Sequence, residues 1–244
     1  LKAIHSVASN KDSMYFLGSD FRIYQTQSPG NAVSVSTKAL TREIERMTDA
    51  SDAIGWCFTL NDQYFYLLTF PSGNRTFVFP EGGHWFELSS GVLGGKFNGT
   101  AYTFVFNKHL IEVDGNILEW DEETYTENSA VIRRVRDTAP LHGGLFQAPG
   151  KSLTMNRFEL ILETGVGLLS GQGSDPNVML SFSDDGGRTF STEMWGQIGK
   201  MAEFMYKVEW FVLGTFESRI LRIAVSDPVT VSIHHAAADL EIGI

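Results

Sequence analysis

The sequence predicts an all-β protein in which partial or degenerate β-propeller blades are followed by a β-sandwich-like unit. Three observations favour this fold. The 244 residues include 18 Phe and 24 Gly but only 7 Pro, a composition typical of short strands joined by tight turns. Apolar and polar residues alternate with a period of two, for example over 158–164. Turn residues also recur at regular intervals between these segments.

The first half of the chain has the pattern of consecutive hairpins. Strand candidates at 14–17 and 21–24 flank Gly18-Ser19-Asp20, which we expect to form a turn. Within residues 52–90 there are four strand candidates, the size of one propeller blade: 53–60, 64–70, 76–79 and 85–88. Residues 100–121 repeat this theme weakly and with different spacings. We therefore expect a degenerate propeller rather than a regular one.

One helix is predicted near 37–48. Leu40, Ile44 and Met47 recur at positions i, i+4 and i+7, which gives a single apolar stripe. Ser36 or Thr37 is a suitable N-cap. A helix with one apolar stripe is expected to pack on a sheet.

An acidic and polar stretch, 121–129, predicts a solvated connection between two domains. We place a propeller-like region at 1–128, which we expect to continue N-terminally in the full protein, and a β-sandwich-like region at 129–244. The second region contains strand candidates at regular spacing: 130–135, 158–164, 178–183, 206–212, 221–225, 229–233 and 238–242.

The segment Ser183-Asp184-Asp185-Gly186-Gly187-Arg188-Thr189-Phe190 fits the spacing Ser-x-Asp-x-Gly-x-Thr-aromatic, known as the Asp-box. Ser and Asp side chains can accept backbone N–H groups of a turn, and Gly tolerates a positive φ. An aromatic ring at the end of the motif can anchor the turn by burial. We expect a structural turn without chemistry of its own, built by five residues: Ser183, Asp185, Gly187, Thr189 and Phe190.

The net charge and the cysteine content exclude some classes of function. The net charge is −10 and the pI is near 5.0, so the chain lacks the basic surface from which duplex-binding proteins gain affinity. Cys57 is the single cysteine, which excludes an intrachain disulfide and agrees with assembly in a reducing cytoplasm. No apolar run approaches the ~20 residues of a membrane helix.

Candidate catalytic and metal sites find little support in the sequence. A sialidase-like reading has one Asp-box and Phe21-Arg22-Ile23-Tyr24, which lacks the proline of the sialidase Phe/Tyr-Arg-Ile-Pro motif. His234 and His235 are adjacent, so in a strand they would point to opposite faces and could not share an ion. No nucleophile elbow or phosphate-binding loop occurs. We expect no catalytic residues, no metal and no cofactor.

From the Asp-box onward the chain resembles a known family. The run 179–190 continues through Ile198-Gly199-Lys200, Val208-x-Trp210-x-x-Leu213-Gly214, Arg219 and 225–229. This pattern is similar to the C-terminal region of the packaged-DNA stabilisation proteins, also called tail hub proteins or tail accessory factors, of short-tailed, podovirus-like bacteriophages. Residues 34–47 and 53–85 resemble the mid-chain segment of the same family, in the same order. We expect the chain to correspond to the C-terminal half or so of such a protein.

The resemblance implies a non-enzymatic structural protein of the virion tail, assembled in the host cytoplasm. It implies a homo-oligomeric ring of six copies below the portal and its adaptor, which closes the DNA exit channel, retains the packaged genome and attaches the tail needle and tailspikes. DNA would pass through without specific binding, and no membrane contact is implied. Where relatives are basic around Trp210, this chain is aromatic and acidic, so we expect interface contacts from Phe204, Trp210, Phe211 and Phe216.

Two alternatives remain. One is a secreted Asp-box propeller that binds or cleaves glycans. The other is a host-encoded β-propeller scaffold without a role in a phage.

Overall fold

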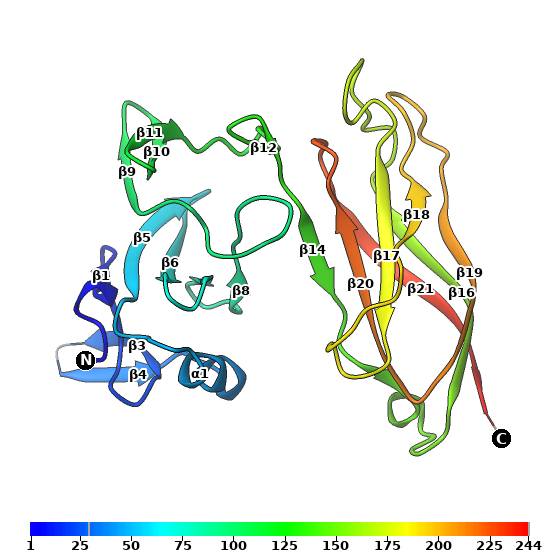
Figure 1. Cartoon of the computed structure of the whole chain (residues 1–244), viewed down its shortest axis with the longest axis horizontal. Coiled ribbons are helices and arrows are strands. Elements are labelled where there is room, and N and C mark those ends of the chain that lie inside the picture. The colour runs from blue at the N-terminus through cyan, green and yellow to red at the C-terminus, as the bar shows by residue number, and fades with distance from the viewer. Residues whose placement is uncertain (29, 244) are drawn as a thin grey trace. The chain divides into compact units, whose positions relative to one another are not determined.

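The computed structural model describes residues 1–28 and 30–243, and nearly all of its regular structure is β (Figure 1). The chain divides into two compact units, Leu1–Glu122 and Glu123–Ile244. The boundary inferred from the sequence lies a few residues later, after 128. The predicted fold class, all-β with a single short α-helix, is confirmed.

The first unit consists of three antiparallel sheets in which hydrogen-bonded neighbours are also consecutive in the chain. This up-and-down order is that of propeller blades. The first sheet contains β1 (Ala8–Ser9), β2 (Met14–Leu17), β3 (Ile23–Ser28) and β4 (Asn31–Ser34). The second contains β5 (Ile54–Leu60), β6 (Gln63–Phe70), β7 (Arg75–Pro80) and β8 (Phe86–Glu87). The third contains β9 (Ala101–Val105), β10 (Lys108–Val113) and β11 (Asn116–Glu119).

A two-residue turn sets the register of the β5–β6 hairpin. Leu60 pairs with Gln63, which leaves Asn61 and Asp62 as the loop, with φ angles of 48° and 61°. Two consecutive positive φ angles are characteristic of a type I′ turn, whose twist matches that of the flanking strands. Asn and Asp tolerate this left-handed conformation better than other non-glycine residues.

The helix α1 (Lys38–Glu45) is the one α-helix of the described residues. Thr37 caps it, because its hydroxyl accepts the backbone N–H of Leu40 at 3.2 Å. Leu40 and Ile44 are buried, as the apolar stripe predicts, whereas Met47 lies beyond the end of the helix. The helix is therefore a few residues shorter than the predicted segment.

Aromatic stacking supports the core of the first unit. Tyr15 lies against Tyr66 at a ring distance of 4.9 Å, and Trp56 against Tyr102 at 5.5 Å. Cys57 is half-buried and packs against the cluster that contains Tyr15 and Tyr66, and burial raises the pKa of its thiol to about 12. This thiol is therefore protonated at neutral pH, as is typical of a buried structural cysteine.

The second unit is a β-sandwich (Figure 1). One sheet has the order β14-β20-β17-β18 with β15 also on β20, and the other has the order β19-β16-β21. Their strands are β14 (Arg134–Asp137), β15 (Leu141–His142), β16 (Leu153–Leu162), β17 (Asn177–Ser183), β18 (Met194–Gln197), β19 (Val208–Phe216), β20 (Ser218–Val225) and β21 (Ile233–Ile242). A short hairpin of β12 (Thr126–Glu127) and β13 (Ala130–Val131) precedes them.

The core of the sandwich is formed by alternate apolar residues from both sheets, such as Met155, Leu160, Leu180 and Leu221. The predicted strand at 229–233 is wrong: only Ile233 is in a strand, as the first residue of β21. The backbone carbonyl of Val229 instead accepts a hydrogen bond from the Arg134 guanidinium at 2.8 Å. Among the described residues, no helix has the length and apolar character needed to cross a membrane.

Candidate functional site

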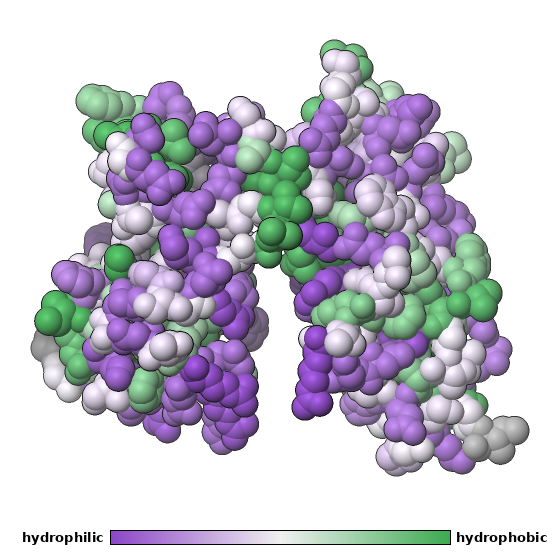
Figure 2. Space-filling view, viewed as in Figure 1, coloured by the Kyte–Doolittle hydropathy of each residue, from purple (hydrophilic) through white to green (hydrophobic). Residues whose placement is uncertain are grey.

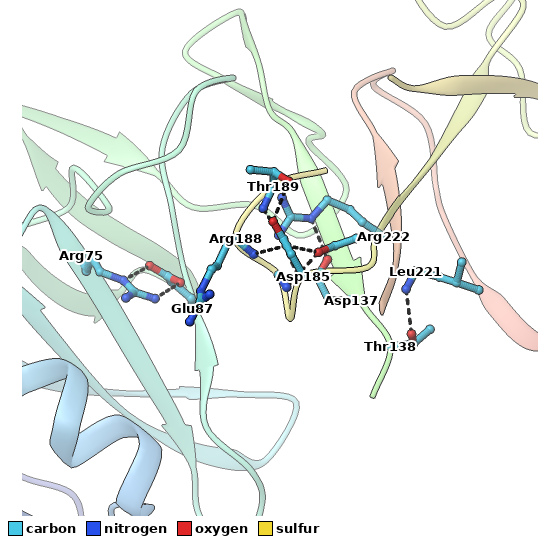
Figure 3. A network of polar contacts seen from close by, with 11 residues as sticks. Arg75, Glu87, Asp137, Thr138, Asp185, Arg188, Thr189, Leu221 and Arg222 are labelled. Carbon is cyan, nitrogen blue, oxygen red and sulfur yellow. Dashed lines mark hydrogen bonds and ion pairs between the residues drawn. The ribbon is translucent and has the colours of Figure 1, made fainter. Parts of the chain in front are cut away.

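The Asp-box turn connects β17 to β18 and is organised by Asp185 (Figure 3). One oxygen of this carboxylate accepts hydrogen bonds from the Ser183 hydroxyl at 2.7 Å and from the backbone N–H groups of Arg188 and Thr189 at 2.9 and 3.0 Å. The other oxygen accepts the Thr189 hydroxyl at 2.7 Å. Ser183 in turn accepts the backbone N–H of Gly187 at 2.8 Å. The turn is closed by side chains acting on backbone donors three and four residues ahead.

These hydrogen bonds also determine the charge of Asp185. Each donor stabilises the ionised carboxylate, with the backbone N–H of Thr189 contributing most, and holds the pKa of Asp185 well below the 3.8 of a free side chain. A carboxyl group with a depressed pKa and four engaged donors cannot serve as a general acid near neutral pH. The geometry therefore fits a structural role for this residue.

Phe190 ends the turn, and its ring is half-buried rather than fully buried as expected. The exposed face is covered by the Arg222 guanidinium at 3.6 Å from the ring centre. Arg222 also donates two hydrogen bonds of 2.7 Å to Asp137, so it ties β20 to the edge strand β14 (Figure 3). The end of the Asp-box is thus attached to the sheet through a cation rather than through a buried ring.

A second arginine, Arg219, connects the turn to the core. Its side chain is buried and makes a two-bond ion pair with Asp184, with both N···O distances at 2.7 Å. It also donates to the carbonyl of Leu213 and lies between the rings of Phe182 and Phe216 at 4.0 and 4.2 Å. No local pattern predicts this pairing, because Asp184 occupies a variable position of the Asp-box.

The four aromatic residues expected at an interface separate into two groups. Trp210 and Phe216 are only 6% and 5% exposed and pack in the sandwich core, which corrects the prediction for both. Trp210 stacks on Phe158 and donates its indole N–H to the carbonyl of Met194 at 3.1 Å. Phe204 and Phe211, in contrast, are 71% and 60% exposed. Only the latter two are available for contacts with another molecule.

Phe204 belongs to a larger exposed patch at one end of the sandwich. The loops 163–176 and 198–207 lie side by side there (Figure 1), because Gly165 donates to the Ile198 carbonyl and accepts from Ala202. Gly165 has a φ of 78°, and a Cβ at this position would come within 2.7 Å of the Phe204 ring. We call this patch the apolar tip; it comprises Leu168, Leu169, Met201, Phe204 and Met205, all exposed. Hydrophobic residues, green in Figure 2, lie at this end of the sandwich.

Phe211 lies beside a strained segment of β19. Two residues, Val212 and Leu213, oppose the single residue Asn156 of β16, which makes a β-bulge. Val212 has a φ of 56°, an unfavourable conformation for a β-branched residue, and its side chain is 88% exposed. The bulge turns Phe211 and Val212 outward together.

The described residues provide no evidence for a metal site. Within residues 1–28 and 30–243, no group of three or more His, Cys, Asp or Glu side chains could hold a metal ion. His234 and His235 are both exposed on β21 and belong to no such group.

The comparison with protein families gives one match. Residues 140–241, which are less than half of the chain and lie within the second unit, match the family described as "Bacteriophage P22 Gp10, beta-sandwich". This match supports a structural protein of a phage virion, and it agrees with the observed sandwich. No curated protein matches the chain.

Two solved structures show weak likeness. A glycoside hydrolase family 43 arabinoxylan arabinofuranohydrolase from Bacillus subtilis is 10% identical, with a TM-score of 0.24 over 98% of this chain and 53% of its own. A mutant Trypanosoma rangeli sialidase is 9% identical, with a TM-score of 0.27 over 97% of this chain and 56% of its own. The chain thus spans about half the length of either structure. Similarity at this level carries no argument about activity.

Proposed function

We propose that the chain is part of the tail hub of a short-tailed phage. In this role it closes the DNA exit channel below the portal and its adaptor, retains the packaged genome, and attaches the needle and tailspikes. The match of residues 140–241 to the beta-sandwich of bacteriophage P22 Gp10 carries the proposal. It is supported by the sequence resemblance to the tail hub family, which extends into the first unit over 34–47 and 53–85.

The charge of the chain suits a channel that DNA passes. With a net charge of −10, the protein repels phosphates at long range instead of binding them. Weak contact with DNA allows the genome to leave without being held by the wall. We therefore propose confinement of the DNA without specific binding.

The exposed apolar residues of the sandwich supply contacts for assembly. We propose that the apolar tip and the Phe211–Val212 bulge contact neighbouring tail proteins in a ring, with six copies by resemblance. Exposed aromatic and methionine side chains are enriched in protein interfaces, and strained backbone is concentrated at sites of function. The virion tail is then the location of the protein, with assembly in the host cytoplasm.

No specific observation favours a glycan-cleaving function. The Asp-box carboxylate is committed to the turn by its four hydrogen bonds. We propose that the protein is not an enzyme.

Light scattering of the chain, alone and with the adaptor ring of its phage, tests the proposal. We expect a complex with the adaptor that is lost in the double variant Phe204→Ala/Phe211→Ala. The matched control is Phe86→Ala/Phe106→Ala, which removes two exposed rings from the first unit and should leave the complex intact. A wild-type chain that stays monomeric in both conditions contradicts the proposal, as does a control variant that loses the complex equally.

A further inference from the structure

The first unit contains a cavity that the tail role does not use. Its volume is about 810 Å³, within the roughly 300–1,000 Å³ typical of small-molecule sites. The residues that matter for its chemistry are Lys11, Asn61, Asp62, Tyr102, Phe104 and His109.

The cavity lies where the first strands of three consecutive sheets meet. β5 contacts both β1 and β9 (Figure 1), and each of the three strands, or the turn that follows it, contributes lining residues. The walls of the cavity are therefore strands and tight turns rather than long loops.

One wall of the cavity is aromatic and held in place. Tyr102 stacks on Trp56 with the rings nearly parallel at 6°, and its hydroxyl shares a hydrogen bond of 2.8 Å with Nδ1 of His109. Phe104 lies 4.8 Å from the His109 ring and is 55% exposed. The result is an exposed ring that neighbouring rings orient before any ligand arrives, which lowers the ordering cost of binding.

The rest of the lining is mainly polar, and some of its polar groups form no hydrogen bond within the described residues. The type I′ turn places Asn61 and Asp62 at the rim, where the Asn61 amide nitrogen donates to Glu122 at 3.0 Å and leaves its carbonyl oxygen available. The side chains of Lys11 and Asp62 make no hydrogen bond or ion pair with the part of the chain that the structure describes. One cation, one carboxylate and one amide oxygen thus remain as partners for a ligand.

The combination of an aromatic ring with one lysine, one aspartate and one amide oxygen favours one class of ligand. A phosphate-bearing ligand needs clustered cations or a helix N-terminus, whereas here a single lysine is balanced by an aspartate. A purely apolar ligand would leave the polar wall unpaired. A sugar ring has an apolar C–H face that can stack on an aromatic ring and hydroxyl groups that can both donate and accept. We propose that this cavity binds a neutral saccharide, with Phe104 as the stacking platform and Asp62 and Lys11 as hydroxyl partners.

Saturation-transfer difference NMR on the whole chain tests for binding. The probes are two neutral oligosaccharides, maltotetraose and tetra-N-acetylchitotetraose. We expect saturation of the ring C–H protons of at least one probe, because the stacked face lies closest to the protein. AMP and the peptide Gly-Phe-Gly-Phe serve as phosphate and peptide probes. No transfer to any saccharide, or stronger binding of AMP or the peptide, overturns the proposal.

Two variants locate the site. Phe104→Ala should weaken the saccharide affinity about tenfold or more through loss of the platform, and Asp62→Asn should weaken it less while preserving the turn. Phe106→Ala is the matched control, because Phe106 is 88% exposed on the same hairpin but does not line the cavity. All three should keep the wild-type melting temperature within a few degrees. Equal affinities for Phe104→Ala and wild type, or a loss confined to Phe106→Ala, would exclude this cavity.

Discussion

Asp185 is the residue on which the Asp-box turn depends most. Its carboxylate accepts four hydrogen bonds, two of them from backbone N–H groups that would otherwise have no partner in the turn. We expect Asp185→Ala to lower the melting temperature by several degrees. The control is Asp175→Ala, which removes only an exposed ion pair of 3.9 Å with Lys200 and should have little effect. Equal melting temperatures for the two variants would contradict this role.

A substitution at Gly187 tests the backbone conformation of the same turn. Its φ is 90°, and the atom nearest to an added Cβ is 3.6 Å away on Ile220, so space does not restrict this position. A β-branched residue is strained at this φ, and Gly187→Val should therefore reduce the free energy of unfolding by about 1–3 kcal/mol. Urea denaturation measures the difference. A neutral result would mean that the turn adopts another conformation in solution.

The depressed pKa of Asp185 makes its contribution depend on pH. The pKa of Asp185 in the folded protein lies below the 3.8 of the free side chain. Between these two pKa values the unfolded chain binds more protons than the folded one, so the stability decreases as the pH is lowered. The contribution of Asp185 to stability is fully present above the pKa of the free side chain, 3.8, and is lost as the pH falls through the pKa of the folded state. We expect the stability difference between wild type and Asp185→Asn to be largest near neutral pH and to shrink towards pH 3. A constant difference across this range would contradict the assignment.

The sequence and the structure agree at some residues and not at others for identifiable reasons. The spacing of the Asp-box is local, so its hydrogen bonds could be anticipated from residues 183–190. The inward position of Leu213 could not be anticipated, because the β-bulge changes the alternation within β19. Val208 and Trp210 point inward, and after the extra residue Leu213 and Phe216 do so. A strict period of two would have assigned some of these side chains to the wrong face.

At the scale of elements, the β-bulge of β19 concentrates strain in one exposed residue. Val212→Asn should raise the free energy of unfolding by about 1 kcal/mol, because Asn tolerates positive φ better than Val. The control Thr215→Gly, on the same strand at an ordinary φ, should lower it by about 0.5–1 kcal/mol. A destabilised Val212→Asn would mean that the valine is not strained, and it would remove one argument for a binding role of the bulge.

Arg219 connects elements that are distant in the sequence. It joins the Asp-box to β19 and β20 through Asp184, the Leu213 carbonyl and two rings. Arg219→Ala should lower the free energy of unfolding by about 2–4 kcal/mol through lost packing and an unpaired carboxylate. Arg188→Ala keeps the backbone N–H that serves Asp185 and should be nearly neutral in the same urea titration. Similar losses in both variants would contradict the buried ion pair.

Elements were predicted best where their signals are local. The helix follows from its apolar stripe and its threonine cap, and β5–β8 follow from turn residues between aromatic strands. The assignment of strands to sheets depends on contacts between distant segments, such as β14 with β20. No local pattern encodes these pairings.

At the scale of the whole molecule, the features of the two units indicate different functions. The sandwich carries the phage match and exposes the apolar tip, whereas the first unit carries blade-like sheets around an aromatic and polar cavity. We infer that the sandwich serves attachment and that the first unit contributes a ligand site. Variants in one unit should therefore leave the function of the other intact.

A structural part of a phage tail should be visible in the assembled particle. A low-resolution electron-microscopy image of the protein together with its portal and adaptor provides this test. We expect a closed ring of copies bound below the adaptor. Particles of portal and adaptor with no added ring, at protein concentrations well above those in an infected cell, would contradict it.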